Sequence, residues 1–227
     1  KLIKEKLSNY IIKFLIIDDK SDKIPINEIK INEDIILIKN SKNVGHQKSL
    51  VRGLNYIKLK YFKETDYICI MDMDGEDSEN DIIKLILASK KYGISVARRI
   101  KRKEEKLFIF LYSIYKIFFY ILTFKKINFG NFMVIKINCL DKIINLPNIH
   151  YHIAGSLIAN KFKLNRVNIE KSTRMFGRSK MGYWRLILHG FKSFYVNLGN
   201  ISKTLFYYLC ILLFLDFFLE KYFLNII

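Results

Sequence analysis

Cysteine is scarce in this sequence of 227 residues: Cys69, Cys139 and Cys210 stand far apart, each in an apolar run. Their spacing fits neither a metal-ligand motif nor a disulfide framework, so the sequence predicts buried thiols in a reducing compartment. Internal repeats and low-complexity linkers are missing as well, which predicts a single globular domain. No segment resembles a signal peptide, and the first residue is Lys1, so we expect the chain to begin inside a longer protein.

Acidic residues are also in short supply, with 21 Asp and Glu against 39 Lys and Arg and a net charge of +18. A surplus of this size suits an anionic partner such as lipid headgroups, a phosphorylated substrate or nucleic acid. Nucleic acid is the weakest of the three, because the basic residues are dispersed and no recognition motif is present. The aromatic fraction of 15% is high and predicts a lipid-facing portion.

The scarce carboxylates gather in residues 67–80, where a short apolar run is followed by Asp72, Asp74, Glu76 and Asp77. This pattern predicts a buried strand with negative charge at its carboxyl end, where open α/β sheets bind ligands. Asp72 and Asp74 share a face of an extended chain, and Gly75 permits a turn that brings the next acids back. Such oxygen ligands suit Mg²⁺ or Mn²⁺. The alternative is an acidic turn that only starts the following helix.

The surrounding pattern alternates strands and helices. We expect strands at 11–17, 35–38 and 94–97 and helices at 48–59 and 81–92, which predicts a parallel sheet with covered faces. The first strand ends at Asp18 and Asp19. The strand at 94–97 runs into the basic cluster 98–103, which is either a solvated surface or a phosphate site on the same edge as the acids.

Two long apolar segments follow. Residues 107–124 have basic flanks and Lys116 near their middle, which favours a helix lying on a membrane surface over a crossing one, with a buried core helix as the alternative. Residues 201–227 have about the length of a membrane span, although Asp216 would be costly inside one. The N-terminal side of this segment carries Lys180, Arg185, Lys192 and Lys203, so the positive-inside rule places the globular part in the cytoplasm.

Three further motifs carry polar residues. Asn43-Val44-Gly45-His46-Gln47 predicts a turn that opens a helix. His150 and His152 follow Pro147, and we expect His150 to be structural, whereas His152 is a better candidate for a functional role. Residues 174–180 form a basic loop hinged at Gly177, which suits a diphosphate.

Taken together, these motifs resemble a family 2 glycosyltransferase of the GT-A fold, in the branch similar to dolichyl-phosphate mannose synthase and bacterial polyprenyl-phosphate sugar transferases. The resemblance runs from about residue 11 to residue 200. It rests on the sequences at 17–22, 43–47, 71–77, 129–132 and 174–181, taken in this order.

The resemblance implies an α/β fold, the Rossmann-like and mostly parallel GT-A sheet, over residues 1–200, lacking its first strand, with an interfacial helix at about 107–124 and a C-terminal transmembrane segment at 201–227. It implies a metal-dependent inverting enzyme on the cytoplasmic face of the inner membrane. The assigned residues are Asp72, Asp74 and Glu76 for Mg²⁺ or Mn²⁺; Asp18, Asp19, Lys42, Asp72, Arg174 and Lys180 for the nucleotide sugar; Arg98, Arg99, Arg102 and Ser113 for an acceptor phosphate; and Asp74, Asp77 and Arg174 for catalysis.

The sequence departs from the family pattern at several positions. Asn128 stands where many members have Asp, Met133 where many have Arg, and Lys20 where Gly is usual. These changes leave open whether the acceptor is a polyprenyl phosphate or a sugar hydroxyl, for which Asp77 would be the base. A different class, a non-catalytic basic membrane-binding protein, explains the charge but not the acids at two strand ends.

Overall fold

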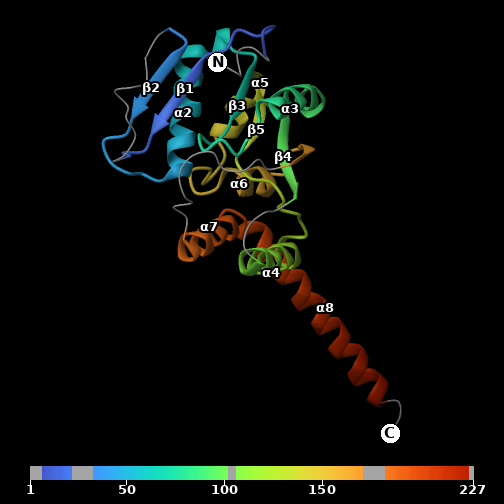
Figure 1. Cartoon of the computed structure of the whole chain (residues 1–227). Helices are drawn as coiled ribbons and strands as arrows, with labels where there is room; N and C mark the ends of the chain where they lie inside the picture. The colour runs from blue at the N-terminus through green and yellow to red at the C-terminus, as the bar shows by residue number, and fades with distance from the viewer. Residues whose placement is uncertain (1–6, 22–32, 102–105, 171–181, 225–227) are drawn as a thin grey trace.

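The computed structural model describes residues 7–21, 33–101, 106–170 and 182–224, and these form an α/β body from which one long helix projects (Figure 1). Within them, six strands make two sheets. In the smaller sheet, β1 (Phe14–Asp18) pairs in parallel with β2 (Ile35–Lys39). β2 matches the predicted strand at 35–38 to within one residue, whereas β1 begins at Phe14 and not at residue 11.

The larger sheet has the strand order β3-β5-β4-β6, made of β3 (Tyr67–Ile70), β5 (Met133–Lys136), β4 (Ile94–Lys101) and β6 (Asn165–Glu170). β5 is antiparallel to both of its neighbours, whereas β4 and β6 are parallel. The expectation of a mostly parallel sheet is thus corrected to mixed pairing. The pairing is mixed because the chain turns back after α4, so that β5 lies between β3 and β4 and runs antiparallel to both.

The basic cluster also needs a correction. The sequence predicts a strand that ends at residue 97, but β4 continues through Arg98 and Arg99 to Lys101. β6 lies alongside this extension in parallel, pairing Arg98 with Asn168 and Arg99 with Ile169. Backbone pairing with a distant strand therefore keeps these polar residues extended.

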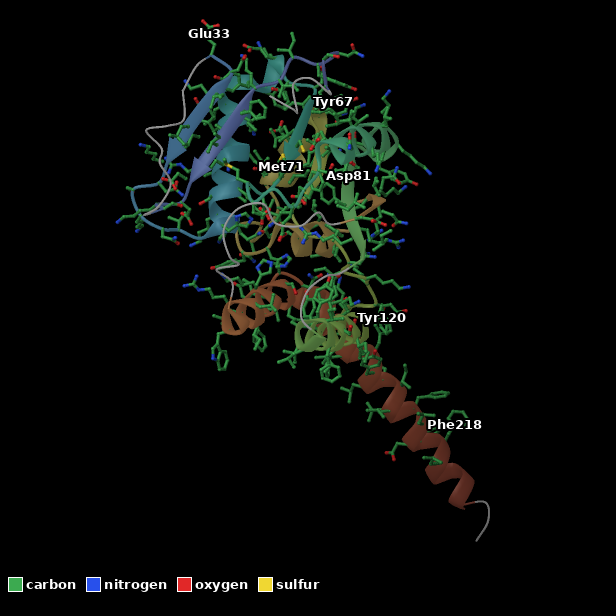
Figure 2. All side chains as sticks on the ribbon, viewed as in Figure 1. Glu33, Tyr67, Met71, Asp81, Tyr120 and Phe218 are labelled. Atoms are coloured by element: carbon green, nitrogen blue, oxygen red, sulfur yellow. The ribbon has the colours of Figure 1, made fainter. Side chains whose placement is uncertain are left out.

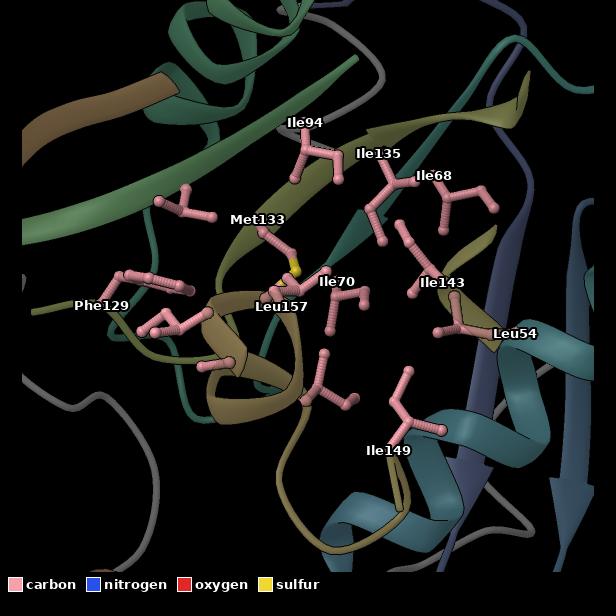
Figure 3. Packing of buried hydrophobic residues seen from close by; sticks show 14 of the residues in the cluster. Leu54, Ile68, Ile70, Ile94, Phe129, Met133, Ile135, Ile143, Ile149 and Leu157 are labelled. Carbon is pink, nitrogen blue, oxygen red and sulfur yellow. The ribbon is translucent and has the colours of Figure 1, made fainter. Parts of the chain in front are cut away.

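The helices cover both faces of the larger sheet. α3 (Glu79–Tyr92) packs on the face that carries Val134. The opposite face, with Met133 and Ile135, is covered by α2 (His46–Tyr61), α5 (Ile137–Ile144) and α6 (Ile153–Ala159). Figure 3 shows Leu54, Ile143 and Leu157 from these three helices converging on the sheet. A 3₁₀ turn (Phe62–Glu64) leads from α2 into β3.

α2 joins the two sheets, which share no strand pairing. Gly53 faces β1 so closely that an added Cβ would lie 2.2 Å from Ile17 Cδ1. The next residue, Leu54, is buried in the cluster that contains Ile68 and Ile70 of β3. One helix therefore packs on both sheets, and its N-terminus lies at the carboxyl ends of β1 and β3.

α3 begins and ends at the residues that helix-capping chemistry favours. The Ser78 hydroxyl accepts a hydrogen bond from Asn80 N at 3.3 Å, and Glu79 and Asp81 occupy the first turn, where negative charge is favourable. Gly93 ends the helix in the left-handed conformation at φ 79°. The acidic stretch therefore starts the helix, as the alternative interpretation of the sequence predicts. This role does not conflict with metal binding by the acids that precede the helix.

Three helices lie below the body, namely α4 (Lys106–Thr123), α7 (Tyr183–Tyr195) and α8 (Leu198–Leu224) (Figure 1). The Tyr115 hydroxyl on α4 lies 2.7 Å from the Ser193 hydroxyl on α7, and the Phe119 and Phe194 rings are 5.6 Å apart. Tyr208 on α8 donates to the Ile121 carbonyl at 2.8 Å. These contacts hold the three helices together.

The cysteines are free, as the sequence predicts, but they are not buried. Cys69 and Cys210 are exposed and Cys139 is half-buried. Cys69 lies on the face of β3 opposite Ile68 and Ile70, and Cys210 lies on the outer surface of α8. An apolar run does not distinguish a residue in a protein core from one on the surface of a helix that the body does not cover.

Candidate active site

The acidic turn after β3 folds back on itself. Gly75 has φ 76°, a left-handed conformation that glycine adopts without strain. Beyond it, an Asp77 carboxylate oxygen accepts a hydrogen bond from Asp72 N at 3.3 Å, and Asp74 Oδ1 accepts one from Glu76 N at 3.1 Å. The predicted return of the acids toward one point is confirmed for Asp77.

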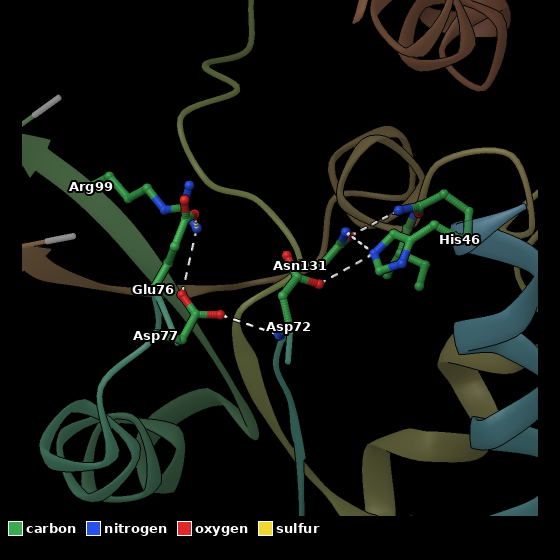
Figure 4. Close-up of polar contacts among 8 residues, drawn as sticks. His46, Asp72, Glu76, Asp77, Arg99 and Asn131 are labelled. Carbon is green, nitrogen blue, oxygen red and sulfur yellow. Dashed lines mark hydrogen bonds and ion pairs between the residues drawn. The ribbon is translucent and has the colours of Figure 1, made fainter. Parts of the chain in front are cut away.

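Arg99 binds the inner side of this turn (Figure 4). Its guanidinium lies 3.5 Å from Asp77 Oδ1 and 4.0 Å from Glu76 Oε2. Burial raises the pKa of Asp77 to about 6, although Arg99 and the hydrogen bond from Asp72 N act in the opposite direction. Asp77 therefore combines deep burial with a pKa that suits proton transfer near neutral pH.

A second pair of acids lies at the carboxyl end of β1. Asp19 accepts hydrogen bonds from Val44 N and Gly45 N, both at 2.8 Å, and from Asn40 Nδ2 at 2.9 Å. Burial raises the pKa of Asp19, but these donors outweigh it and the net shift is downward. Asp18 is buried, and one of its oxygens accepts from Ser21 N at 2.9 Å. Both carboxylates thus fix the loops around the entrance to α2.

His46 brings the end of β3 together with the start of α2. Its Nε2 atom lies 3.5 Å from Asp72 Oδ1 and 2.9 Å from Asn131 Nδ2 (Figure 4). The sequence places His46 and Asn131 in motifs but does not predict that they meet Asp72. Their contact joins positions far apart in the chain, and the only sequence signal is the polar side chains at the helix opening and before β5.

The residues predicted to bind the acceptor phosphate do not all lie at the acidic turn. Arg99 reaches the acids, whereas its neighbour Arg98 points to the other side of β4 and donates to Asn168 Oδ1 at 2.7 Å. Ser113 bonds within α4, to the Ile109 carbonyl at 2.8 Å. Arg102 lies outside the described residues. Only Arg99 of this set is placed at the acidic turn by the structure.

The predicted diphosphate loop, with Arg174 and Lys180, lies outside the described residues. Lys42 is exposed on the loop that leads into α2. These three positions stay predictions from the sequence.

His152 and His189 form a second polar cluster, between α6 and α7. Their rings stack with centroids 4.4 Å apart, and His152 Nδ1 accepts from Gly155 N at 2.9 Å, which caps α6. Burial, helped by its histidine neighbour, lowers the pKa of His152 to about 3, and burial with the charge of Lys192 lowers that of His189 to about 4. Both rings are neutral at pH 7. The His152 ring therefore has a clear structural role.

The acids do not form a protein cage for a metal ion. Within the described residues, no three Asp, Glu, His or Cys side chains gather closely enough to hold one by themselves. Glu76 faces Arg99, whereas the Asp72 side chain is 42% exposed. Mg²⁺ is commonly held by one or two carboxylates together with substrate phosphates, and the Asp72 and Asp74 carboxylates fit that mode.

Comparison with known proteins identifies a family. The family model described as Glycosyl transferase family 2 matches residues 2–145, which is more than half of the chain. The match includes both pairs of acids, α2, β4 and Asn131. No curated protein matches the chain.

Proposed function

The chain belongs to glycosyltransferase family 2 and is a glycosyltransferase, and on this premise we propose that it transfers a sugar from a nucleotide diphosphate to a polyprenyl phosphate in a membrane. The family implies a nucleotide-sugar donor and an acceptor. The observation that carries the proposal is the acidic turn, with Asp72 half-exposed beside the N-terminus of α2 and Arg99 on its inner side.

On the donor side, Asp72 and Asp74 would hold the divalent cation that family members commonly use. When bound, such a cation stabilises the negative charge of the leaving diphosphate. Asp18 and Asp19 would hold the nucleoside. The bond from Ser21 N to Asp18 fixes the loop after β1, and the bond from Val44 N to Asp19 fixes the loop before α2. Arg174, Lys180 and Lys42 would share the charge of the diphosphate.

On the acceptor side, Arg99 supports an anionic substrate. Its side chain is 28% exposed and therefore reachable, and its guanidinium already binds two carboxylates, as it would bind a phosphate. A lipid phosphate is an anion before it reacts, so it requires no strong general base. Arg102 stays a further predicted contact for this phosphate, whereas Arg98 and Ser113 bond elsewhere.

A sugar hydroxyl is the second candidate acceptor, and one observation favours it. The pKa of Asp77 is raised to about 6 by burial, which makes this carboxylate a suitable base for a hydroxyl at neutral pH. Against it, Asp77 is occupied by Arg99 and by Asp72 N. The two acceptors are distinguished by the product, because only the first gives a sugar linked to lipid phosphate.

The helices below the body support a membrane location. Residues 198–219 of α8 form an apolar helix of 22 residues with 11% of the segment buried, and at 1.5 Å per residue it spans about 33 Å, the thickness of a hydrocarbon layer. Figure 2 shows that the side chains along α8 are almost all carbon. α4 adds an exposed apolar stripe that includes Leu107, Phe110, Ile117 and Ile121, and exposed Phe124 follows the helix directly. We propose that α8 crosses the bilayer and that α4 lies on its surface.

α7 carries a second exposed stripe that the sequence interpretation overlooked. Trp184 is 78% exposed, and Ile187, Leu188, Phe191 and Tyr195 follow at helical spacing on the same side. Arg185 and Lys192 lie among them, as expected for a helix at a layer of anionic headgroups. Arg185 and Lys192 precede the span and Lys203 lies near its N-terminal end. The positive-inside rule therefore puts the catalytic body on the cytoplasmic side.

A transfer assay tests the proposal directly. The full-length protein in membranes is given Mn²⁺ or Mg²⁺, a panel of radiolabelled sugar nucleotides and a polyprenyl phosphate. We expect label to enter the organic phase only when metal is present. Transfer to water-soluble glycans alone would favour the hydroxyl acceptor, and absence of transfer to any acceptor would contradict both.

Asp74→Ala should abolish transfer and leave the fold intact, because the variant removes a carboxylate from the diphosphate site. Glu64→Ala is the matched control, since Glu64 is 66% exposed and pairs with Lys13 at 3.5 Å, away from the acidic turn. Full activity of Asp74→Ala would contradict the proposed site.

A further inference from the structure

A chain of hydrogen bonds connects the start of α6 with the acidic turn. Ile153 N donates to Gln47 Oε1 at 2.8 Å, Gln47 Nε2 donates to Asn131 Oδ1 at 3.0 Å, and Asn131 Nδ2 lies 2.9 Å from His46 Nε2. His46 Nε2 in turn faces Asp72 Oδ1 at 3.5 Å. Gln47 is buried, so its polar atoms depend on these partners.

The backbone N–H of Ile153 fixes which atoms donate and which accept along this chain of hydrogen bonds. Ile153 N–H can only donate, so Gln47 must present its oxygen there and its amide nitrogen to Asn131. Asn131 then accepts with Oδ1 and presents its own amide nitrogen to His46. Turning both amides around would bring two donors together at the buried Ile153 N, which costs about 1–3 kcal/mol.

His46 Nε2 therefore has to accept. An imidazole nitrogen that accepts a hydrogen bond carries no proton, so neutral His46 carries its proton on Nδ1. The nitrogen that faces Asp72 thus offers a lone pair. With a proton on Nε2, His46 would instead donate to Asp72 and compete with any cation for that carboxylate oxygen.

We propose that Gln47 and Asn131 are positioning residues, which hold His46 in the Nδ1–H tautomer and so keep Asp72 available to the cation of the donor diphosphate. The part of this inference that concerns the cation rests on the proposed function. The tautomer itself does not, because it follows from hydrogen bonds within the chain.

His152 provides an internal reference. Its Nδ1 accepts from Gly155 N at 2.9 Å, so its proton must be on Nε2. The structure therefore assigns opposite tautomers to His46 and His152. The sequence contains only 4 histidines, which makes selective labelling practical.

The first experiment records two-bond ¹H–¹⁵N spectra of the full-length, ¹⁵N-histidine-labelled protein in lipid nanodiscs at pH 8.5, above the usual range of imidazole pKa values. His46→Gln assigns the His46 signals. We expect Nδ1–H for His46 and Nε2–H for His152. Wild-type His46 in the Nε2–H form would overturn the proposal.

Asn131→Asp should reverse the hydrogen bond between residue 131 and His46. A carboxylate has no N–H, so His46 must donate from Nε2, and we expect its signals to change to the Nε2–H pattern while those of His152 stay unchanged. Gln47→Glu should do the same, because the introduced carboxylate would accept from both Ile153 N and Asn131 and so turn the Asn131 oxygen toward His46. An unchanged His46 tautomer in a variant whose His152 signals are native would overturn the proposal.

The second experiment measures Mn²⁺ binding by electron paramagnetic resonance, with variants that add no charge. Asn131→Ala releases His46 to donate to Asp72, and we expect Mn²⁺ affinity to fall roughly fivefold. Removing the competing donor as well, in Asn131→Ala with His46→Ala, should restore the affinity, which a merely structural role of Asn131 would not do. If the double variant did not regain Mn²⁺ affinity, the inference would be overturned. If the wild type did not bind Mn²⁺ at all, the proposed cation site would be contradicted, and the tautomer of His46 would be decided by the NMR spectra alone.

Discussion

Asp77 is held in the acidic turn with only 2% of its side chain exposed. Burial raises its pKa from 3.8 to about 6, so the folded protein holds this proton more tightly than the unfolded chain does. The resulting stabilisation is fully present below pH 3.8 and is lost as the pH rises through about 6. At neutral pH, the ionised carboxylate therefore weakens the fold.

Asp77→Asn should reduce this pH dependence. Between pH 4 and pH 6.5, the unfolding free energy of the wild type should fall by up to about 3 kcal/mol more than that of the variant, because the introduced amide has no proton to lose. Thermal unfolding in EDTA, followed by circular dichroism, measures this without a bound metal. Glu64→Gln is the control, and it should keep the wild-type slope. Equal slopes for wild type and Asp77→Asn would contradict the burial argument.

Short-range geometry explains which site residues could be predicted. The positive φ of Gly75 and the return of Asp77 depend on neighbours within a few residues, and the sequence indicates both. The pairing of Arg99 with Asp77 and the contact of Asn131 with His46 depend on how β4 and the segment before β5 pack. No spacing rule in a single sequence encodes those contacts.

At the scale of elements, α7 makes a prediction about membrane contact. Leu188→Asp together with Phe191→Asp would place charge within the exposed apolar stripe, at residues 57% and 64% exposed. Because little of either side chain is packed, the fold should persist while the fit to a lipid surface is lost. We expect weaker protection of α7 amides from hydrogen exchange when the protein is in anionic nanodiscs.

The control for α7 is Leu59→Asp. Leu59 is 79% exposed on α2, away from the three lower helices, and its replacement should leave the protection of α7 unchanged. If the α7 variant were protected as strongly as the wild type in lipid, this helix would not lie at the membrane surface.

Gly93 makes a prediction about the end of α3. Its φ of 79° is strained for any L side chain, and an added Cβ would lie 2.4 Å from Cys139 Sγ. Gly93→Ala should therefore lower the unfolding free energy by about 1–3 kcal/mol, measured by denaturant titration. Gly182→Ala is the control, since no atom of the described residues lies within 4 Å of its added Cβ. A Gly93→Ala protein as stable as that control would argue against this geometry.

The elements themselves were largely predictable, because hydrophobic periodicity and capping residues are local. α2 and α3 begin within two residues of the expected positions 48 and 81. β4 is longer than predicted, because its second half is too polar to resemble a strand and is extended by pairing with β6. β6, α5 and α6 were not predicted from the sequence. The apolar stripe of α7 is regular in the sequence as well, but its exposure depends on what packs against it.

At the scale of the molecule, the α/β class follows from the sequence and the sheet order does not. β5 lies between β3 and β4, although all of α4 separates it from β4 in the chain. Strand order is set by long-range burial, here of Met133, Val134 and Ile135, all fully buried. The antiparallel β5 thus introduces the mixed pairing that local patterns did not indicate.

The arrangement of charge and apolar surface makes the last prediction. The body carries most of the charged side chains, whereas α8 extends away from it with an almost entirely apolar surface (Figure 2). If α8 spans the bilayer, the full-length protein should resist extraction from membranes by alkaline carbonate, which releases proteins bound only by charge.

Leu209→Lys with Leu213→Lys should remove this resistance. Both residues are exposed, at 52% and 60%, so the substitutions change the outer surface of α8 without disturbing its contact with α4. Two charges inside a span cost several kcal/mol, so carbonate should now extract the protein. Because the net charge is +18, and the stripes on α4 and α7 remain, the extracted variant should still sediment with anionic vesicles at low salt and dissociate at high salt. Equal extraction of wild type and variant would mean that α8 does not cross the membrane.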